Sequence, residues 1–191
     1  MQSAINIFTV EEYLELEKTS QIRHEFVDGE VFAMAGASKE HNTISLNIAS
    51  RLRSHLRGGS CSVFMADMKV NIQLNSRHNK SIYYYPDVVV SCDSDDKDRF
   101  SLNYPCLIIE VLSPSIEITN KREKLVNYCT LESLQEYVLV SQEEIKVEVY
   151  RKDTQDNWLM QTLGKDDELR LDSIDLTLTM PEIYEDVIKI I

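Results

Sequence analysis

The chain has 191 residues, 43% of them hydrophobic and 27% charged, with 5 Gly and 4 Pro. These values are typical of one globular domain covering residues 1–191, and they exclude a disordered or fibrous chain. The formal net charge of -12 argues against a surface built for non-specific nucleic-acid binding, although a local cationic groove or a metal ion can reverse the sign of the field locally.

The apolar segments and the cysteines indicate where the protein resides. Apolar runs such as residues 106–109 are far shorter than the ~20 residues of a membrane helix, so we expect no membrane association. The first residues show no basic stretch followed by an apolar core, which favours a cytoplasmic location. The four cysteines form no Cys-x-x-Cys pair, and we interpret them as reduced residues that fill the core: Cys61, Cys92, Cys106 and Cys129.

Three local patterns organise the N-terminal part of the chain. A capping box at residues 9–12 predicts a short helix that ends near Ser20. Apolar alternation over residues 24–34, on both sides of an Asp-Gly pair, predicts a β-hairpin. Apolar residues at helical spacing predict a second helix over residues 38–57, which a Gly-Gly pair ends.

Short β-rich segments dominate the remainder. Asn120 is the predicted N-cap of a further helix that extends to about Thr130. The last segment, residues 169–191, is less clearly patterned. The element order predicts an α/β fold in which a mixed β-sheet is flanked by helices, with an N-terminal helix and hairpin and a C-terminal β-meander. The predicted strands cover residues 62–65, 69–74, 85–91, 105–112, 135–140, 145–151 and 158–163.

Glu110 interrupts the most apolar predicted strand, residues 107–112, which is typical of a central strand buried on both faces. An unpaired carboxylate in such a place costs roughly several kcal/mol, so it requires a cation, a metal ion or a raised pKa. Alternatively, Glu110 ends the buried part of the strand at a solvated rim, or pairs with a basic residue.

Asp87 repeats the anomaly at the start of another apolar strand, after Pro86. If the two strands are neighbours, Asp87 and Glu110 can converge on one hard divalent cation, because Mg²⁺ prefers oxygen ligands and often takes one or two carboxylates plus substrate phosphate. A simple turn cap is the alternative for Asp87.

Pro86-Asp87 followed by Glu110 resembles the PD-(D/E)XK nuclease signature, and the wider pattern is similar to the Uma-two family of restriction-endonuclease-like proteins. The similarity runs from about Phe8 to Tyr150 or beyond, and the ordered set of motifs carries it. The resemblance implies a restriction-endonuclease-like fold. The matching positions are residues 25–30, 34–38, 41, 67, 85–87, 110–115, 124, 128 and 136–140.

The lysine of the signature normally lies two residues after the acidic strand residue, where this chain has Leu112. The Uma-two pattern takes its lysine from the following helix, which implies Lys124, with Lys121 as a substitute. Such a lysine can position the nucleophile or stabilise charge on the phosphoryl group; without the resemblance both would be solvated helix lysines. Asn120 stands where the family often has an acidic residue.

The resemblance also implies roles for other polar residues. Glu25 is a candidate third metal ligand or holder of a water molecule, and the main-chain carbonyl of Val111 is a further candidate ligand. His41 is a candidate supporting or substrate-contacting residue, and Asp67 could support the same sheet edge. The alternatives are a hairpin surface charge for Glu25, a structural histidine for His41 and a turn cap for Asp67.

These expectations combine into a metal-dependent nuclease that hydrolyses phosphodiester bonds, with DNA as the expected substrate, Mg²⁺ or Mn²⁺ as cofactor, and a homodimer as the expected assembly. Asp87, Glu110, Glu25 and Lys124 are the expected catalytic residues, and Asp87, Glu110 and Val111 the expected metal ligands. The alternative is a catalytically inactive module of the same fold that binds a protein or nucleic-acid partner, which the acidic charge and Asn120 favour.

Overall fold

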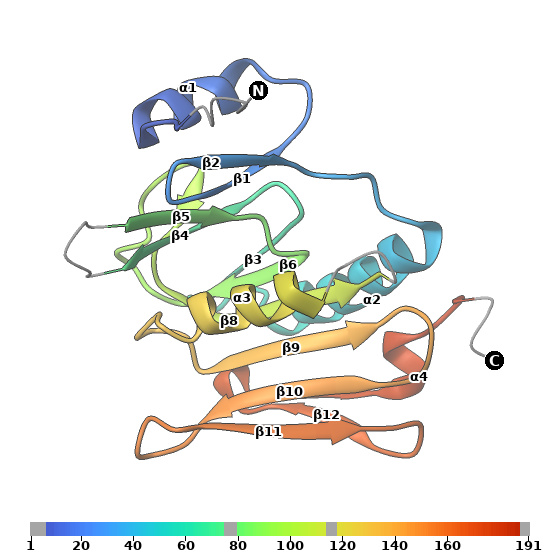
Figure 1. The fold of residues 1–191 in the computed structure, drawn as a ribbon. Coiled ribbons are helices and arrows are strands. Elements are labelled where there is room, and N and C mark those ends of the chain that lie inside the picture. The colour runs from blue at the N-terminus through green and yellow to red at the C-terminus, as the bar shows by residue number, and fades with distance from the viewer. Residues whose placement is uncertain (1–6, 75–79, 114–117, 188–191) are drawn as a thin grey trace.

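The computed structural model describes residues 7–74, 80–113 and 118–187, with the backbone alone for residues 118–121. The strands of these residues form three sheets, and Figure 1 shows how they are arranged. Two of them combine parallel and antiparallel pairs, and four α-helices within the described residues accompany them, so the predicted mixed α/β fold is confirmed. The sequence predicted one sheet, whereas the strands divide into three.

The five-stranded sheet contains the predicted hairpin. Asp28 and Gly29 have φ values of 50° and 97°, the left-handed conformation that a two-residue hairpin turn requires. Helix α1 (Val10–Thr19) begins with the predicted Thr9 capping box and packs Tyr13 against Phe26 of this sheet. Figure 1 shows α1 beside the hairpin strands. The strand order is β2 (Glu30–Ala33), β1 (His24–Val27), β5 (Lys80–Tyr84), β4 (Lys69–Leu74) and β7 (Ser101–Leu102).

The six-stranded sheet contains the predicted meander of β9, β10 and β11. Strand β8 lies inside this sheet, parallel to β9 and antiparallel to β6, and its first seven residues are buried. The prediction of a central strand buried on both faces is therefore confirmed. The strand order is β11 (Trp158–Leu163), β10 (Val147–Lys152), β9 (Glu136–Ser141), β8 (Pro105–Leu112), β6 (Val88–Ser91) and β3 (Ser62–Met65).

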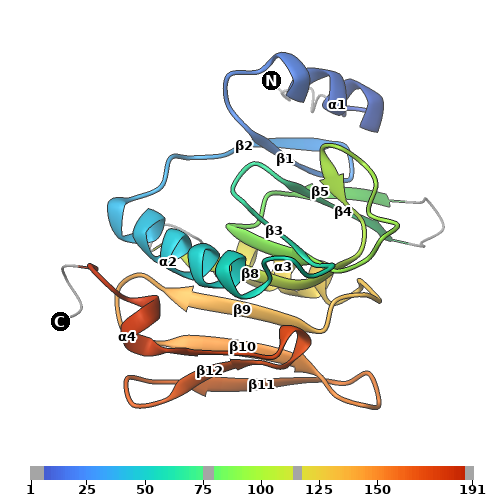
Figure 2. The ribbon, with the colours of Figure 1, turned by 180° about the vertical axis from the view of Figure 1, so that it is seen from behind.

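Two cores cover the two faces of this sheet. Helix α2 (Lys39–His55) and the C-terminal elements pack on the face that bears Leu107 and Ile109. The opposite face, which bears Ile108, packs against helix α3 (Ile118–Tyr128) and against the five-stranded sheet. Figure 2, the view from behind, shows α2 in front of β8 and α3 behind it. Strand β8 thus lies between two helices on opposite faces.

Several boundaries differ from the sequence prediction. The predicted strand 85–91 is shorter in the structure, where it forms β6 alone, and β5 precedes it at residues for which no strand was predicted. Asp87 lies in the connection between β5 and β6. Helix α3 begins at Ile118, so Asn120 lies inside the helix and is not its N-cap. The weakly patterned tail forms a two-stranded sheet and a short helix: β12 (Glu168–Leu171), η1 (Asp172–Ile174), β13 (Leu176–Thr179) and α4 (Met180–Ile183).

The expectation that all four cysteines are reduced is wrong. Cys61 and Cys92 form a disulfide, while Cys106 and Cys129 are free. The pairing follows from topology, because β3 and β6 are neighbours and place these two cysteines side by side at adjacent strand ends, although 31 residues separate them. Among the described residues, no helix combines the length and apolarity needed to cross a membrane.

Candidate metal and phosphodiester site

Glu110 is buried on the central strand. The residue is 6% exposed, and strand alternation places its side chain on the same face as Ile108, toward α3 and the five-stranded sheet. It therefore does not reach a solvated rim. The Nζ atom of Lys124 lies 3.3 Å from its Oε1 atom, and the Tyr128 hydroxyl donates to the same oxygen at 3.1 Å.

Lys124 joins Glu110 to Glu25. Its Nζ atom lies 2.7 Å from Oε1 of Glu25 and 5.2 Å from the centre of the Tyr84 ring. The Lys124 and Glu25 side chains are 21% and 17% exposed, so both are largely removed from water. Oε1 of Glu25 is buried and accepts no hydrogen bond of good geometry from the described residues, despite this ion pair. Glu25 is thus not a hairpin surface charge.

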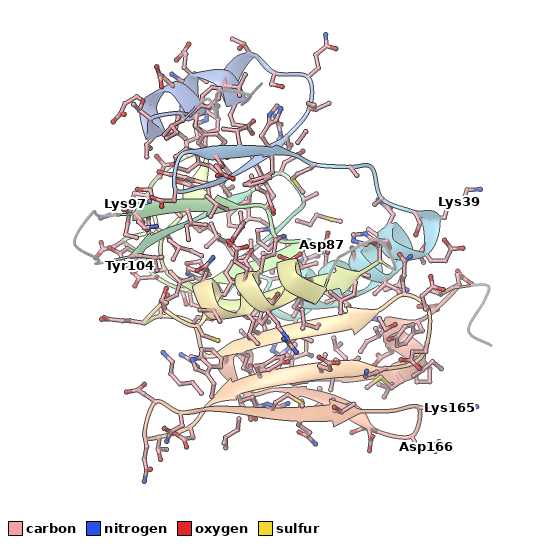
Figure 3. All side chains as sticks on the ribbon, viewed as in Figure 1. Lys39, Asp87, Lys97, Tyr104, Lys165 and Asp166 are labelled. Atoms are coloured by element: carbon pink, nitrogen blue, oxygen red, sulfur yellow. A yellow bond between two sulfur atoms is a disulfide. The ribbon has the colours of Figure 1, made fainter. Side chains whose placement is uncertain are left out.

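Asp87 is anchored to the strand that carries Glu110. The backbone N–H of Val111 donates to Oδ2 of Asp87 at 2.7 Å, and Nε2 of His41 lies 3.2 Å from the same oxygen. The β6–β8 register pairs Val88 with Ile109, and one further step places Asp87 opposite Glu110. Figure 3 labels Asp87 near the middle of the molecule. The two carboxylates therefore come together as the sequence predicted for neighbouring strands.

Burial and neighbouring charges determine the protonation of this cluster. Burial raises the pKa of Glu110 to about 7; Lys124 opposes this shift, and the carboxylates of Asp87 and Glu25 add to it. Burial alone would lower the pKa of Lys124, but Glu110 and Glu25 outweigh it and raise that pKa, so Lys124 remains protonated. Burial also acts to lower the pKa of His41. The hydrogen bond and the charge interaction with Asp87 outweigh this effect, so the pKa of His41 is raised.

The other residues predicted to support the site either lie away from Glu110 or have side chains outside the described residues. Asp67 is 75% exposed at its side chain and pairs with Arg23 at 3.1 Å, so the structure does not bring it to Glu110. The side chain of Lys121 lies outside the described residues. Tyr83, Tyr84 and Tyr85 are each at most 6% exposed, so their rings pack inside the protein.

Sequence reasoning assigned no role to three residues that hold the cluster together. Tyr128 contacts Glu110, Tyr84 lies against Lys124, and Asn127 donates to the Tyr84 hydroxyl at 2.8 Å. The spacing of Lys124 and Tyr128 was an available signal, because residues four apart share one face of a helix. The contact of Tyr84 required the fold, since no local pattern links β5 to α3.

Replacing Tyr128 with phenylalanine should lower the free energy of unfolding by about 1.5–3 kcal/mol at pH 8, because a buried hydrogen bond to a charged group is lost. Urea unfolding measures the change. The matched control is Tyr150→Phe, whose half-buried hydroxyl lies 3.5 Å from Glu148; it should change the free energy by less than about 0.5 kcal/mol. Equal losses in the two variants would refute a specific role for the Tyr128 hydroxyl.

The donor set fits a hard divalent cation. Asp87, in the connection before β6, and Glu110 on β8 offer carboxylate oxygens, and Val111 offers a backbone carbonyl on the residue after Glu110. Within the described residues, no group of three or more His, Cys, Asp and Glu side chains is arranged to hold a metal ion. Mg²⁺ is usually bound through one or two carboxylates, with water and substrate phosphate completing its shell.

Comparison with known proteins identifies relatives and a shared fold. Residues 10–181 match the Uma2 family, described as "Putative restriction endonuclease". Two Synechocystis sp. proteins, "Uncharacterized protein slr1290" and "Uncharacterized protein sll1609", are 38% and 33% identical over 91% and 85% of this chain and 90% and 92% of their own lengths.

A solved structure from Anabaena variabilis, described as "a putative nuclease belonging to DUF820", superposes with a TM-score of 0.74 at 17% identity, covering 95% of this chain and 99% of that chain. It shows a shared fold along nearly the whole length. Together with the family match, it confirms the resemblance found in the sequence. The chain belongs to the Uma2 family of restriction-endonuclease-like proteins.

Proposed function

We propose that this protein is a metal-dependent nuclease that hydrolyses phosphodiester bonds, with DNA as its substrate. The observation that carries the proposal is the buried Glu110 carboxylate, placed opposite Asp87 with Lys124 at 3.3 Å. A carboxylate on a central strand is costly to bury, and its pKa of about 7 reflects that cost. A divalent cation at this position would compensate the charge.

Asp87, Glu110 and the carbonyl of Val111 are the residues that would hold Mg²⁺ or Mn²⁺. When bound, the ion would supply charge neutralisation at the scissile phosphate and a lowered pKa for the attacking water. Glu110 and Val111 lie on β8, and Asp87 immediately precedes β6, which pairs with β8, so the strand pairing holds these residues at a fixed separation.

The protein's own residues supply a cation and its support. Lys124 is protonated and lies beside Glu110, where it can stabilise negative charge that develops on a phosphoryl oxygen. Glu25 holds the ammonium group at 2.7 Å, and the Tyr84 ring lies against it. His41 and the N–H of Val111 hold Oδ2 of Asp87, which anchors that carboxylate to the strand that carries Glu110.

Two observations favour the second candidate, a catalytically inactive module that binds a partner. Lys124 already pairs with both Glu25 and Glu110, so the protein itself supplies one positive charge to the buried cluster. The net charge of -12 also opposes long-range attraction of nucleic acid. The two candidates differ in divalent-metal binding, which only the nuclease requires. A homodimer remains a proposal by analogy with two-stranded substrates.

Cleavage of labelled single- and double-stranded DNA at low salt tests the proposal, with Mg²⁺, Mn²⁺ or EDTA. We expect Asp87→Asn and Glu110→Gln to reduce the rate by about 10³-fold, which corresponds to several kcal/mol of charge stabilisation. Asp67→Asn is the matched control, because this exposed carboxylate pairs with Arg23; its rate should stay within about twofold of wild type.

Cutting that persists in EDTA, or that is equal in all three variants, would contradict this site. Absence of cutting on every substrate, together with absence of Mg²⁺ and Mn²⁺ binding by calorimetry, would favour the inactive binding module.

A further inference from the structure

Three cysteine sulfurs gather at the ends of three neighbouring strands, β3, β6 and β8. Cys61 immediately precedes β3, Cys92 immediately follows β6, and Cys106 is the second residue of β8. The register pairs Ser62 with Ser91, and Ser91 with Pro105 after a bulge, so the strand ends are adjacent. The three cysteines, 45 residues apart in sequence at most, form a single cluster.

The cluster contains both a disulfide and a free thiol. Cys61 is bonded to Cys92, and the Cys106 sulfur lies 3.6 Å from the Cys92 sulfur. Cys106 is 7% exposed, and its thiol also donates to the Val90 carbonyl at 3.4 Å, so its position is defined. A nucleophilic group is thus in van der Waals contact with one sulfur of an existing disulfide.

We propose that Cys61, Cys92 and Cys106 form a thiol–disulfide exchange site in which Cys92 is the shared sulfur. The Cys106 thiol loses its proton and the thiolate attacks Sγ of Cys92. The Cys61–Cys92 bond breaks as the Cys92–Cys106 bond forms, and Cys61 leaves as a thiolate that takes up a proton. One disulfide and one thiol are present before and after, so no external oxidant or reductant is needed.

The strand order determines which pairs can form. Strand β6 lies between β3 and β8, so Cys61 and Cys106 are attached to strands about 10 Å apart, two inter-strand spacings. A disulfide normally requires Cα atoms within about 7 Å, so the Cys61–Cys106 pair is excluded without backbone movement. Cys92 can therefore bond to either neighbour, while those neighbours cannot bond to each other.

Exchange moves the cross-link from one strand pair to another. The starting bond joins the ends of β3 and β6, whereas the product bond joins β6 to β8. Strand β8 carries Glu110 and Asp87 immediately precedes β6, so the product state covalently links the two strands that position the carboxylates. The released Cys61 is half-buried and thus open to thiol reagents.

Burial raises the pKa of Cys106 to about 11, so only a small fraction is thiolate at neutral pH. The starting disulfide is therefore expected to persist at pH 7. Because the thiolate is the attacking species, the exchange rate should rise about tenfold per pH unit while the pH remains below that pKa.

Tryptic mapping tests the proposal, because the four cysteines fall on four separate tryptic peptides: residues 58–69, 81–97, 100–121 and 125–146. Cys129→Ser removes the remaining free thiol. This single variant, with the native disulfide formed, is held at pH 8 or pH 9 without added thiols, then quenched in acid and labelled with N-ethylmaleimide. We expect the label to appear on peptide 58–69 while a disulfide between peptides 81–97 and 100–121 accumulates. Both changes should be about tenfold faster at pH 9 than at pH 8.

Further variants in the same background identify the shared sulfur. In a buffer of reduced and oxidised glutathione, Cys61→Ser should link 81–97 to 100–121, and Cys106→Ser should link 58–69 to 81–97. Cys92→Ser should leave 58–69 and 100–121 unlinked. The proposal is overturned if label stays on peptide 100–121 throughout the pH 9 incubation, if the native pair does not form, or if Cys61→Ser leaves both remaining sulfurs unlinked.

Discussion

Replacing Lys124 with methionine is expected to lower the free energy of unfolding by about 3–5 kcal/mol at pH 8, because the change leaves two buried carboxylates without their shared cation. Glu110 and Glu25 lie 3.3 and 2.7 Å from its ammonium group, and all three side chains are at most 21% exposed. The raised pKa of Lys124 keeps this contribution intact until the pH rises above 10.5. Urea unfolding measures the loss.

The same substitution at Lys18 is the control. Lys18 and Glu15 form an ion pair on α1 at 2.7 Å, with side chains 67% and 68% exposed, so Lys18→Met should change the free energy by less than about 1 kcal/mol. The Lys124→Met loss should also shrink at pH 5, where Glu110 is protonated and carries no charge to compensate. A loss that is equal for the two lysines, or unchanged between pH 8 and pH 5, would contradict the buried network.

Glu110→Gln is expected to remove a pH dependence of stability in the metal-free protein. In the folded state the pKa of Glu110 is raised from 4.5 to about 7, so the folded chain binds the proton more tightly than the unfolded chain. The stabilisation of the folded state by protonated Glu110 is fully present below pH 4.5, and it is lost as the pH rises to 7. The difference of about 2.5 units corresponds to about 3 kcal/mol, at 1.36 kcal/mol per unit.

Urea unfolding of both proteins in EDTA at pH 5 and pH 8 gives the required comparison. Relative to Glu110→Gln, the wild type should lose up to about 3 kcal/mol between these two pH values. Adding Mg²⁺ or Mn²⁺ at pH 8 should restore part of that stability in the wild type and little in the variant, because ligand binding to the folded state is stabilising. A pH profile shared by both proteins would show that Glu110 does not titrate as described.

Local patterns predicted those parts of the fold that are determined by local physics. The Thr9 capping box, the Asp28-Gly29 turn and the apolar run of β8 each depend on residues within one element, and all three are as predicted. Glu110 stood out because a charge within an apolar strand is costly whatever surrounds it. The approach of Asp87 to Glu110 required one further condition, that β6 and β8 are neighbours.

Features that depend on long-range contacts could not be predicted in this way. The division into separate sheets and the Cys61–Cys92 bond are set by strand order, which periodicity does not encode. Glu136 shows the limit clearly: it is 2% exposed and accepts hydrogen bonds from Arg151 and from the Ser173 backbone and hydroxyl. Glu136 is the first residue of β9, where a carboxylate is not conspicuous in the sequence, and its partners make it a structural carboxylate.

The position of β8 inside its sheet has a consequence for the timing of biosynthesis. A chain emerging from the ribosome presents Glu25, Asp87, Glu110 and Lys124 before β9 has been made, and the edge of β8 that pairs with residues 136–141 is open until then. Tyr137, whose ring packs against the Tyr128 ring beside Glu110, is also made only with β9. A nascent chain shorter than about 140 residues therefore holds all four charged residues, but it lacks the parallel β8–β9 pair.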